Sequence, residues 1–520
     1  MIKNIKNRNF TIYLFWILVI LFFLKIDYRL TEDIFCCSDD FDYYSHAETI
    51  AEDFDFDYKN QLKGAETKRY NYNGKIAPIG FVGSGILSSP FIVIGNFLDS
   101  IFNAGQITNF KILLYSFSPI FYLMLSYKLL NKTLRNLDIN VNHLLVFALF
   151  FGSGITYYVF ERFSMSHAFE IFSITLLMFY SSKYFKNDKY LLHMFLSLML
   201  AYQVKWTNYF IFLIPLIVKE LSNSSKKIFN NKKAFLIFAL VNGLNLSLVY
   251  SIYKQLTFNP FNIYNRNQSI SNYVTTNPGG EFNFELLLHL KNFINIFFTQ
   301  EFGIIYFSPV IFLGFLVSIF YFFQFKKNNF KLGLYSFTSY VYIFLVITAW
   351  KSPASSYGFR YALCLLPLSI LLLNKFLDEN NIKRSYTLIL ISFFALLSTL
   401  FFETTPGTQL SLDEQLNTFN VFSRYTQATY LSGFISSLTN LNSYLIIFST
   451  SYLGLFVFKI AVEIFGQNQF FDLLKNLGLP TDNQDFIDLL TQVEKINSNY
   501  FVITVIILLF LLKINKTSIN

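Results

Sequence analysis

Cysteine and charge are both scarce in this sequence, and each shortage excludes a class of protein. The 520 residues include three cysteines, Cys36, Cys37 and Cys364. Two of them are adjacent and cannot easily pair with each other, so no disulfide framework is indicated. Charged residues make up only 14% of the chain, against roughly 25% in soluble domains. With 53% hydrophobic and 20% aromatic residues, the composition predicts a membrane protein.

The residues indicate neither a nucleic-acid partner nor a metal site. The formal net charge is +9, but most of the excess lies in short loops, where basic residues orient membrane helices. No cysteine and histidine spacing typical of a metal site occurs. We therefore expect membrane lipids, and no nucleic acid, among the partners.

The first apolar run, residues 10–24, follows the basic residues Lys3, Lys6 and Arg8. Its length would suit a signal peptide, but no small-residue cleavage site comes after it. We expect an uncleaved anchor whose N-terminus lies in the cytoplasm.

Many further apolar segments predict an all-α, polytopic fold. They are residues 110–127, 141–160, 164–182, 190–204, 206–218, 234–253, 304–325, 332–350, 358–374, 385–402, 441–462 and 499–512. Several are shorter than the roughly 20 residues that cross a bilayer comfortably. The segment 78–98 is long enough but contains Pro90 and four glycines.

The basic loops decide whether 78–98 crosses the membrane. These loops cover residues 128–135, 183–189, 219–233, 326–331 and 375–384. If 78–98 is not a span, all of them face the cytoplasm, whereas a span there would turn them all outward. The positive-inside bias favours the first topology, with about 13 spans and an interfacial or re-entrant helix at 78–98.

We divide the chain into a membrane domain, residues 1–462, and a C-terminal part, residues 463–520. The membrane domain has a large first outer loop at 26–109 and further outer loops at 254–303 and 403–440. The C-terminal part is predicted to hold a cytoplasmic amphipathic segment, broken near Leu479 and Pro480, and a final transmembrane helix. No internal repeat is visible.

The first outer loop carries closely spaced acids, Asp39, Asp40 and Asp42. Apolar residues at helical spacing follow them, which predicts a short amphipathic helix on the membrane surface; they are Tyr43, Ala47, Ile50 and Phe54. A partly desolvated carboxylate at a membrane surface is suited to take a proton from a hydroxyl group. Helix N-capping is the alternative role for aspartate at this position.

Cations are predicted on the same outer face. Arg162 ends one apolar segment, Lys205 lies between two, and Arg360 begins another. Lysine can bind phosphate as a point charge, and arginine offers a bidentate fork. The alternatives are ordinary interfacial roles, such as lysine snorkelling beside a tryptophan.

Other outer residues could line a cavity with these groups. They are His167, Glu301 and Tyr357, while His46 shows no spacing that indicates a site. A base beside several cations suits transfer from a phosphorylated lipid, because lipid phosphates lie at this depth and a soluble nucleotide sugar is not expected outside the cytoplasm.

Six ordered stretches resemble motifs of one family. They are SDDFDYYSHAETIAEDFDFDYKNQ, GKIAPIGFVGSGILSSPF, MSHAFEIFSITLLMFY, LAYQVKWTN, EFGIIYFSPV and SSYGFRYALCLLPL. Together they are similar to the multispanning glycosyltransferases of the C superfamily, which include protein O-mannosyltransferases and the aminoarabinose transferases of lipid A.

The resemblance implies an inverting transfer of a sugar from a polyprenyl-phosphate donor to a hydroxyl group of a lipid, glycan or protein. Asp40 would be the general base, with Asp39 as its rival. The donor phosphate would be held by Arg360 and Lys205, with Arg162 as a third cation. At the position of Lys205 the family usually has arginine. Asp42 and Tyr43 would line the substrate cavity with the residues named above. Dependence on a divalent metal ion varies within the superfamily and is left open.

The resemblance also implies a bacterial inner, or plasma, membrane with the active site facing the periplasm. The alternative function is a transporter or flippase of lipid-linked sugars. Such a protein would more commonly place ionisable groups mid-span along a transport path, whereas here most charges gather at one face of the membrane, which favours the enzyme.

Overall fold

The computed structural model describes most of the chain. The described residues are 38–63, 70–72, 75–78, 80–102, 110–140, 142–160, 162–226, 228, 232–254, 286–298, 303–324, 329–348, 360–380, 382, 386–401, 438–439, 444, 452–477, 502, 505–506 and 509. These residues are mostly helical, which confirms the all-α class. The predicted N-terminal anchor and most of the outer loops at 254–303 and 403–440 lie outside them.

The N-terminal part combines two helices with a small hairpin. Helix α2 (Ser38–Glu48) continues into a π-helical turn, η1 (Thr49–Asp53). Strand β1 (Tyr70–Tyr72) pairs antiparallel with β2 (Lys75–Ala77), so that Tyr70 lies opposite Ala77. Helix α3 (Gly83–Phe102) follows.

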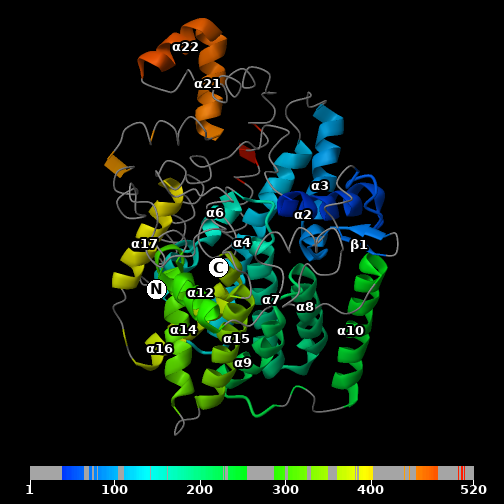
Figure 1. Cartoon of the computed structure of the whole chain (residues 1–520), viewed down its shortest axis with the longest axis vertical. Coiled ribbons are helices and arrows are strands. Elements are labelled where there is room, and N and C mark those ends of the chain that lie inside the picture. Colours follow the sequence, from blue (N-terminus) through cyan, green and yellow to red (C-terminus); the bar gives the residue numbers. More distant parts are fainter. Residues whose placement is uncertain are drawn as a thin grey trace.

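A helical bundle forms the rest of the membrane domain (Figure 1). Its elements are α4 (Phe110–Asn136), α5 (His143–Phe151), α6 (Ile155–Phe160), α7 (His167–Lys186), η3 (Asp188–Tyr190), α8 (Leu191–Val204), η4 (Tyr209–Leu213), α9 (Ile214–Leu221), α10 (Lys232–Tyr253), α12 (Leu286–Phe298), α13 (Ile304–Phe307), α14 (Pro309–Phe322), α15 (Phe330–Thr348), η5 (Arg360–Leu365), α16 (Leu366–Glu379) and α17 (Tyr386–Phe401). Every apolar segment predicted between residues 110 and 402 therefore contains a helix or a broken pair of helices.

Proline sets where several of these helices begin. Pro215, Pro309 and Pro367 occupy the first turns of α9, α14 and α16. A helix has no intrahelical acceptor for its first N–H groups, so proline costs little there. Consequently the predicted segment 304–325 is divided into α13 and α14, with the break at Ser308.

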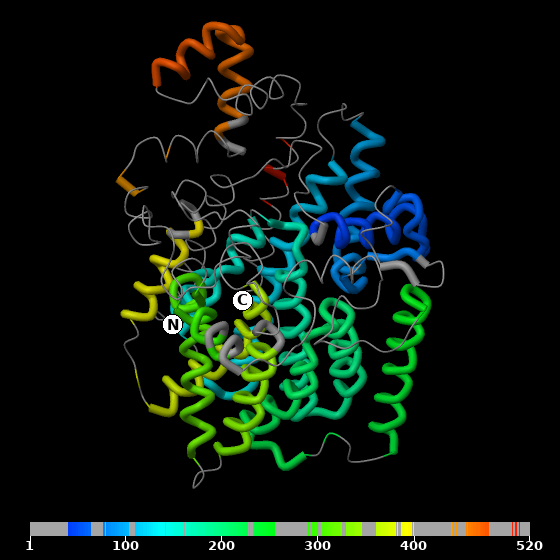
Figure 2. The backbone as a smooth tube through the Cα atoms, viewed as in Figure 1, coloured from blue at the N-terminus to red at the C-terminus, as the bar shows by residue number. Residues whose placement is uncertain are grey.

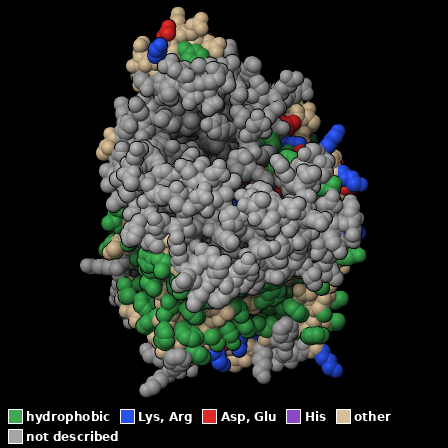
Figure 3. Space-filling view, in the orientation of Figure 1, with side chains coloured by type: hydrophobic (Ala, Val, Ile, Leu, Met, Phe, Trp, Pro, Cys, Tyr) green, Lys and Arg blue, Asp and Glu red, His purple; other side chains and the backbone are tan. Residues whose placement is uncertain are grey.

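The basic loops meet at one end of the bundle, which we call the basic end. Contacts that join these loops are Lys226 Nζ to the Tyr184 carbonyl at 2.8 Å, Lys186 Nζ to Asp138 Oδ2 at 3.8 Å, and the Asn140 N–H to Asp378 Oδ2 at 3.3 Å. Figure 3 shows a band of hydrophobic side chains over the lower helices, with Lys and Arg below it. The grouping of these loops agrees with the prediction, while their cytoplasmic placement stays a prediction.

Four of the described helices are long and apolar enough to cross a membrane, which supports a membrane protein. They are Gly83–Phe102, Phe110–Asn136, Lys232–Tyr253 and Arg360–Glu379, with Pro309–Phe322 and Tyr386–Leu397 as shorter apolar helices. The total of about 13 spans rests on loop charge and stays a prediction.

Helix α3 covers most of the segment predicted to be interfacial or re-entrant. It lies with α2 at the end of the bundle opposite the basic loops (Figures 1 and 2), which we call the site end. A Cβ on Gly83 would lie 2.4 Å from the Val204 nitrogen, and one on Gly95 would lie 2.4 Å from the Lys111 Cα, so α3 is in backbone contact with α8 and α4. Helix α3 is also long enough to span a membrane, and its interfacial or re-entrant placement stays a prediction.

Helices α21 (Tyr452–Phe465) and α22 (Gln467–Asn476) project beyond the site end in Figure 1. The sequence had placed the segment after residue 465 with the basic loops, on the cytoplasmic side, so the observed arrangement differs from that prediction. Most of residues 478–520, including the predicted final transmembrane helix, lie outside the described part of the chain.

Candidate functional site

Helix α2 is buried on most of its surface. Asp40, Asp42, Tyr43 and Ala47 are all buried, whereas the chain becomes exposed at the end of the π-helical turn and at Phe54, which is 84% exposed. A helix is present as predicted, but the prediction that it lies on the membrane surface with one face exposed is wrong. Helix α2 packs against α3, α4 and the loop before α7, so both of its faces are covered.

Asp40 forms an ion pair within the protein. Its Oδ2 accepts a hydrogen bond from Arg162 Nη2 at 2.8 Å, and the two side chains are 3% and 18% exposed. Ser164 Oγ donates to the Asp40 carbonyl at 2.6 Å, and Tyr115 Oη lies 2.9 Å from Ser164 Oγ. Asp40 thus lies inside the first turn of α2 and engages a guanidinium, which differs from the N-capping alternative.

The loop before α7 joins this pair to Arg360. Ser164 contacts Asp40, and its neighbour Met165 accepts a hydrogen bond from Arg360 Nη1 to Sδ at 3.7 Å. Because consecutive Cα atoms are about 3.8 Å apart, the early acid and the distant guanidinium lie at the same end of the bundle. Of the three residues predicted to lie together, Asp40 contacts Arg162, and the loop before α7 links Arg360 to them. A substrate pocket among them stays a prediction.

Lys205 reaches the same place from the end of α8. Arg360 Nη2 donates to Tyr361 Oη at 3.0 Å, and its guanidinium carbon lies 5.0 Å from the centroid of the Tyr361 ring. Lys205 Nζ lies 5.6 Å from the same centroid. Both distances permit cation–π attraction, so one aromatic ring is shared by the two cations predicted to hold a phosphate.

Glu170 is a central residue that the sequence reasoning missed. Its side chain is 2% exposed, and Oε1 lies 3.7 Å from Lys205 Nζ and 3.2 Å from His167 Nδ1. Ser166 Oγ donates to Oε1 at 2.8 Å and Asn208 Nδ2 donates to Oε2 at 3.1 Å. A lone acid inside the apolar run MSHAFEIFSITLLMFY was the available signal, because buried carboxylates need partners.

Two predicted cavity residues, His167 and Tyr43, are buried, and His167 lies beside Glu170. His167 packs edge-on against Tyr158, with ring centroids 4.8 Å apart. Tyr43 lies against Gly80, where an added Cβ would come within 2.5 Å of the Tyr43 ring. The side chain of Asp39, and both Glu301 and Tyr357, lie outside the described residues.

His46 is a second residue that the sequence did not identify. It is fully buried, with Nδ1 2.7 Å from Tyr58 Oη and Nε2 2.8 Å from the Gly80 carbonyl. A carbonyl can only accept, so Nε2 carries the proton and Nδ1 accepts from Tyr58. Burial lowers the pKa of His46 to about 4. Its contacts tie α2 to the segment before α3, which indicates a structural role.

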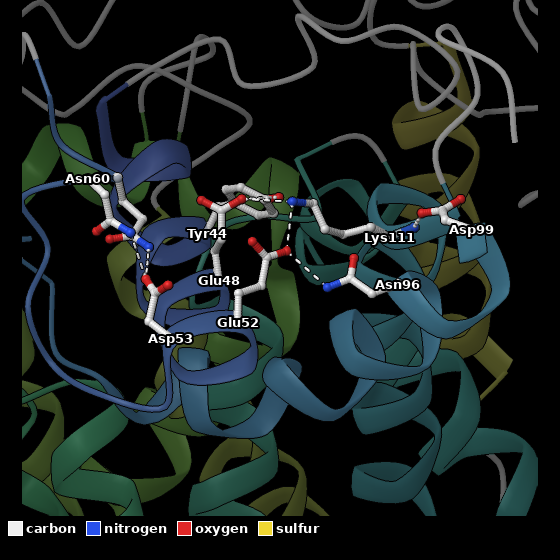
Figure 4. Close-up of polar contacts among 9 residues, drawn as sticks. Tyr44, Glu48, Glu52, Asp53, Asn60, Asn96, Asp99 and Lys111 are labelled. Carbon is white, nitrogen blue, oxygen red and sulfur yellow. Dashed lines mark hydrogen bonds and ion pairs between the residues drawn. The ribbon is translucent and has the colours of Figure 1, made fainter. Parts of the chain in front are cut away.

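A polar cluster on the other side of α2 fixes it against α3 and α4 (Figure 4). Lys111 Nζ lies 2.8 Å from Glu48 Oε1 and 2.9 Å from Glu52 Oε1. Tyr44 Oη donates to Glu48, and Asn96 Nδ2 donates to Glu52. These groups span three helices, so they hold the acid-bearing helix in place.

The same view shows how the helix ends are secured. Both carboxylate oxygens of Asp99 accept backbone N–H groups at the start of α4. Beyond α2, hydrogen bonds from Asn60 and Gln61 hold the pKa of Asp53 below its usual value. Asp53 is exposed and distinct from the buried acids of α2.

Among the residues that the structure describes, no group of three or more histidine, cysteine, aspartate or glutamate side chains is arranged to hold a metal ion. No protein-family model matches the chain, and no curated protein sequence matches it. Functional proposals therefore rest on the geometry of the site end.

Proposed function

We propose that the chain is a membrane glycosyltransferase that moves a sugar from a polyprenyl-phosphate donor to a hydroxyl acceptor. The observation that supports this most is the shared location of one acid–guanidinium pair, Asp40 and Arg162, with two further cations, Lys205 and Arg360. These groups come from distant parts of the chain and lie at the end opposite the basic loops.

The proposed reaction needs a base on one side of the sugar and cations on the other. The acceptor oxygen forms a bond to the anomeric carbon while the bond from that carbon to the phosphate oxygen breaks, which inverts the configuration. The hydroxyl proton passes to Asp40, whose carboxylate is oriented by Arg162. The leaving group is the polyprenyl phosphate. Asp39 remains the rival for the base, and Asp42 is proposed to line the substrate cavity.

Lys205 and Arg360 would hold the donor phosphate. Both side chains are cations, and Glu170 lies 3.7 Å from Lys205. Cations attract phosphate, and when they are fixed in place they stabilise the negative charge that grows on the leaving oxygen. The buried surroundings strengthen both effects, because they keep water away from the charges.

The placement of charge along the helices favours an enzyme over a transporter or flippase. In α4–α10 and α14–α17, every Asp, Glu, Lys and Arg except Lys128 lies within about two turns of a helix end. A transport path would more commonly carry ionisable groups at mid-span. With the basic loops in the cytoplasm, the site would face the periplasm of a bacterial inner membrane.

Transfer from a labelled polyprenyl-phosphate sugar, by purified protein in lipid nanodiscs, tests the proposal. Asp40→Asn should abolish transfer, and Asp39→Asn and Asp42→Asn show whether a neighbouring acid is the base instead. Asp53→Asn is the matched control, because this exposed acid of the same loop hydrogen-bonds only locally to Asn60 and Gln61.

The proposal fails if Asp40→Asn, Asp39→Asn and Asp42→Asn all transfer sugar at the wild-type rate. A vesicle experiment addresses the alternative function directly. Protein that moves the intact labelled lipid between leaflets, without releasing its sugar, would identify a flippase.

A further inference from the structure

Glu170 binds both ends of the turn that carries Lys205. One carboxylate oxygen lies 3.7 Å from Lys205 Nζ, and the other accepts from Asn208 Nδ2 at 3.1 Å. The turn is also closed by its own backbone, because the Asn208 N–H donates to the Lys205 carbonyl at 3.1 Å. Tyr342 Oη of α15 donates to the Thr207 carbonyl at 2.6 Å. This turn therefore has a single, well-supported conformation.

The carboxylate itself has little freedom. It lies in the first turn of α7, where Ser166 Oγ donates to it and the Glu170 N–H donates to the Ser166 carbonyl. A negative charge in the first turn of a helix is favoured by the helix dipole. Glu170 is thus a rigid anion against which a flexible lysine can be held.

Lys205 needs such an anchor because it shares an aromatic ring with a second cation. Lys205 and Arg360 both lie over the Tyr361 ring, at 5.6 and 5.0 Å from its centroid. The two distances together place the charges at most 10.6 Å apart. Like charges in a poorly hydrated site repel at such separations, and a lysine side chain has many rotamers. Without Glu170, Lys205 would move away from Arg360 and the two cations would no longer converge.

We infer that Glu170 is a positioning residue that holds Lys205 beside Arg360, so that both can contact one phosphate of the lipid donor. The inference rests on the proposed function. Glu170 acts through Lys205 and does not contact the donor.

Two opposite effects follow from removing this charge with Glu170→Gln. Lys205 loses its anchor, so stabilisation of the leaving phosphate weakens and kcat should fall by about 10- to 100-fold, as for other misplaced catalytic groups. The cluster also loses one negative charge, so unglycosylated polyprenyl phosphate should bind as tightly as before or more tightly. A residue that only supports the fold would weaken catalysis and binding together.

The experiment measures kcat, KM for the labelled donor, and binding of unglycosylated polyprenyl phosphate, all in nanodiscs. Glu170→Asp keeps the charge on a shorter side chain and should recover part of the lost kcat. Glu379→Gln is the matched control at the basic end, where that glutamate accepts from Tyr321 Oη at 2.8 Å and lies 3.3 Å from Lys375. This variant should leave kcat, KM for the donor and the binding of polyprenyl phosphate unchanged.

A wild-type kcat in Glu170→Gln would overturn the inference, as would a fall in kcat accompanied by weaker phosphate binding. If Glu170→Gln does not fold, kcat and the binding of polyprenyl phosphate are measured in Glu170→Asp and judged in the same way. Wild-type protein that neither transfers sugar nor binds polyprenyl phosphate would instead contradict the proposed function, so the two failures are distinguishable.

Discussion

Removing either partner of the ion pair between Asp40 and Arg162 should destabilise the protein, and removing both should cost less than the sum of the two single effects. The charged atoms are 2.8 Å apart, a separation at which two unit charges attract by roughly 6 kcal/mol at an effective dielectric constant of about 20. Removing one partner of a buried pair costs about 3–5 kcal/mol, because the remaining charge stays buried and uncompensated.

The two single variants should differ in severity. Arg162→Met leaves the Asp40 carboxylate, which is 3% exposed, without its cation, so we expect a loss of about 3 kcal/mol. Asp40→Asn leaves Arg162, which is 18% exposed and reaches water, so we expect about 2 kcal/mol. The double variant buries no charge here and should be less destabilised than the sum by about 2 kcal/mol.

A double-mutant cycle measures this coupling, with unfolding followed by titration of detergent micelles with a denaturing detergent. The exposed pair Lys59 and Asp57 is the control: its atoms are 3.7 Å apart and its side chains are 70% and 48% exposed. The same cycle there should give no more than about 0.5 kcal/mol. Additive effects of Arg162→Met and Asp40→Asn, within about 0.5 kcal/mol, would refute the reasoning.

Two further predictions concern the packing around α2 and α3. The folded-state pKa of His46, about 4, lies below its ordinary value of 6.5, so the unfolded chain binds the proton first as the pH falls. The contribution of neutral His46 to the free energy of unfolding should therefore be fully present above pH 6.5 and decrease by about 3 kcal/mol as the pH falls to 4. His46→Gln should flatten this dependence of the unfolding free energy on pH. An unchanged pH profile in that variant would contradict the assignment. Gly83→Ala should destabilise by about 1–3 kcal/mol, because its Cβ would lie 2.4 Å from the backbone nitrogen of Val204. Gly243→Ala, whose Cβ meets nothing within 4 Å in the middle of α10, should instead stabilise by about 0.5–1 kcal/mol, and equal effects of the two substitutions would argue against close α3–α8 contact.

The site could be predicted in part because some of its members are locally unusual. Lys205 and Arg360 stand out as cations where the positive-inside bias predicts none, and the Asp39–Asp42 acids stand out in an apolar chain. Glu170 carried a weaker signal of the same kind, as a single acid in an apolar run. Its importance appears only when Ser166, Lys205 and Asn208 are seen around it.

The surroundings of α2 show where sequence reasoning failed. The spacing of Tyr43 and Ala47 predicts a helix, and a helix is present. The same spacing suggested one exposed face, yet polar residues such as Asp42 and Ser45 are buried too. Periodicity reports which residues share a face, but not whether other helices also cover the opposite face.

Hydropathy and loop charge were enough to predict a helical membrane protein with its basic loops at one end. Both patterns can be read from consecutive residues, without knowledge of any tertiary contact. The partners of individual charges were not accessible in this way. Asp40 and Arg162 are 122 positions apart, and the contact between Arg360 and Met165 spans 195. Such contacts depend on how the helices pack, because side chains far apart in the chain become neighbours only when the packed helices place them a few ångströms from each other.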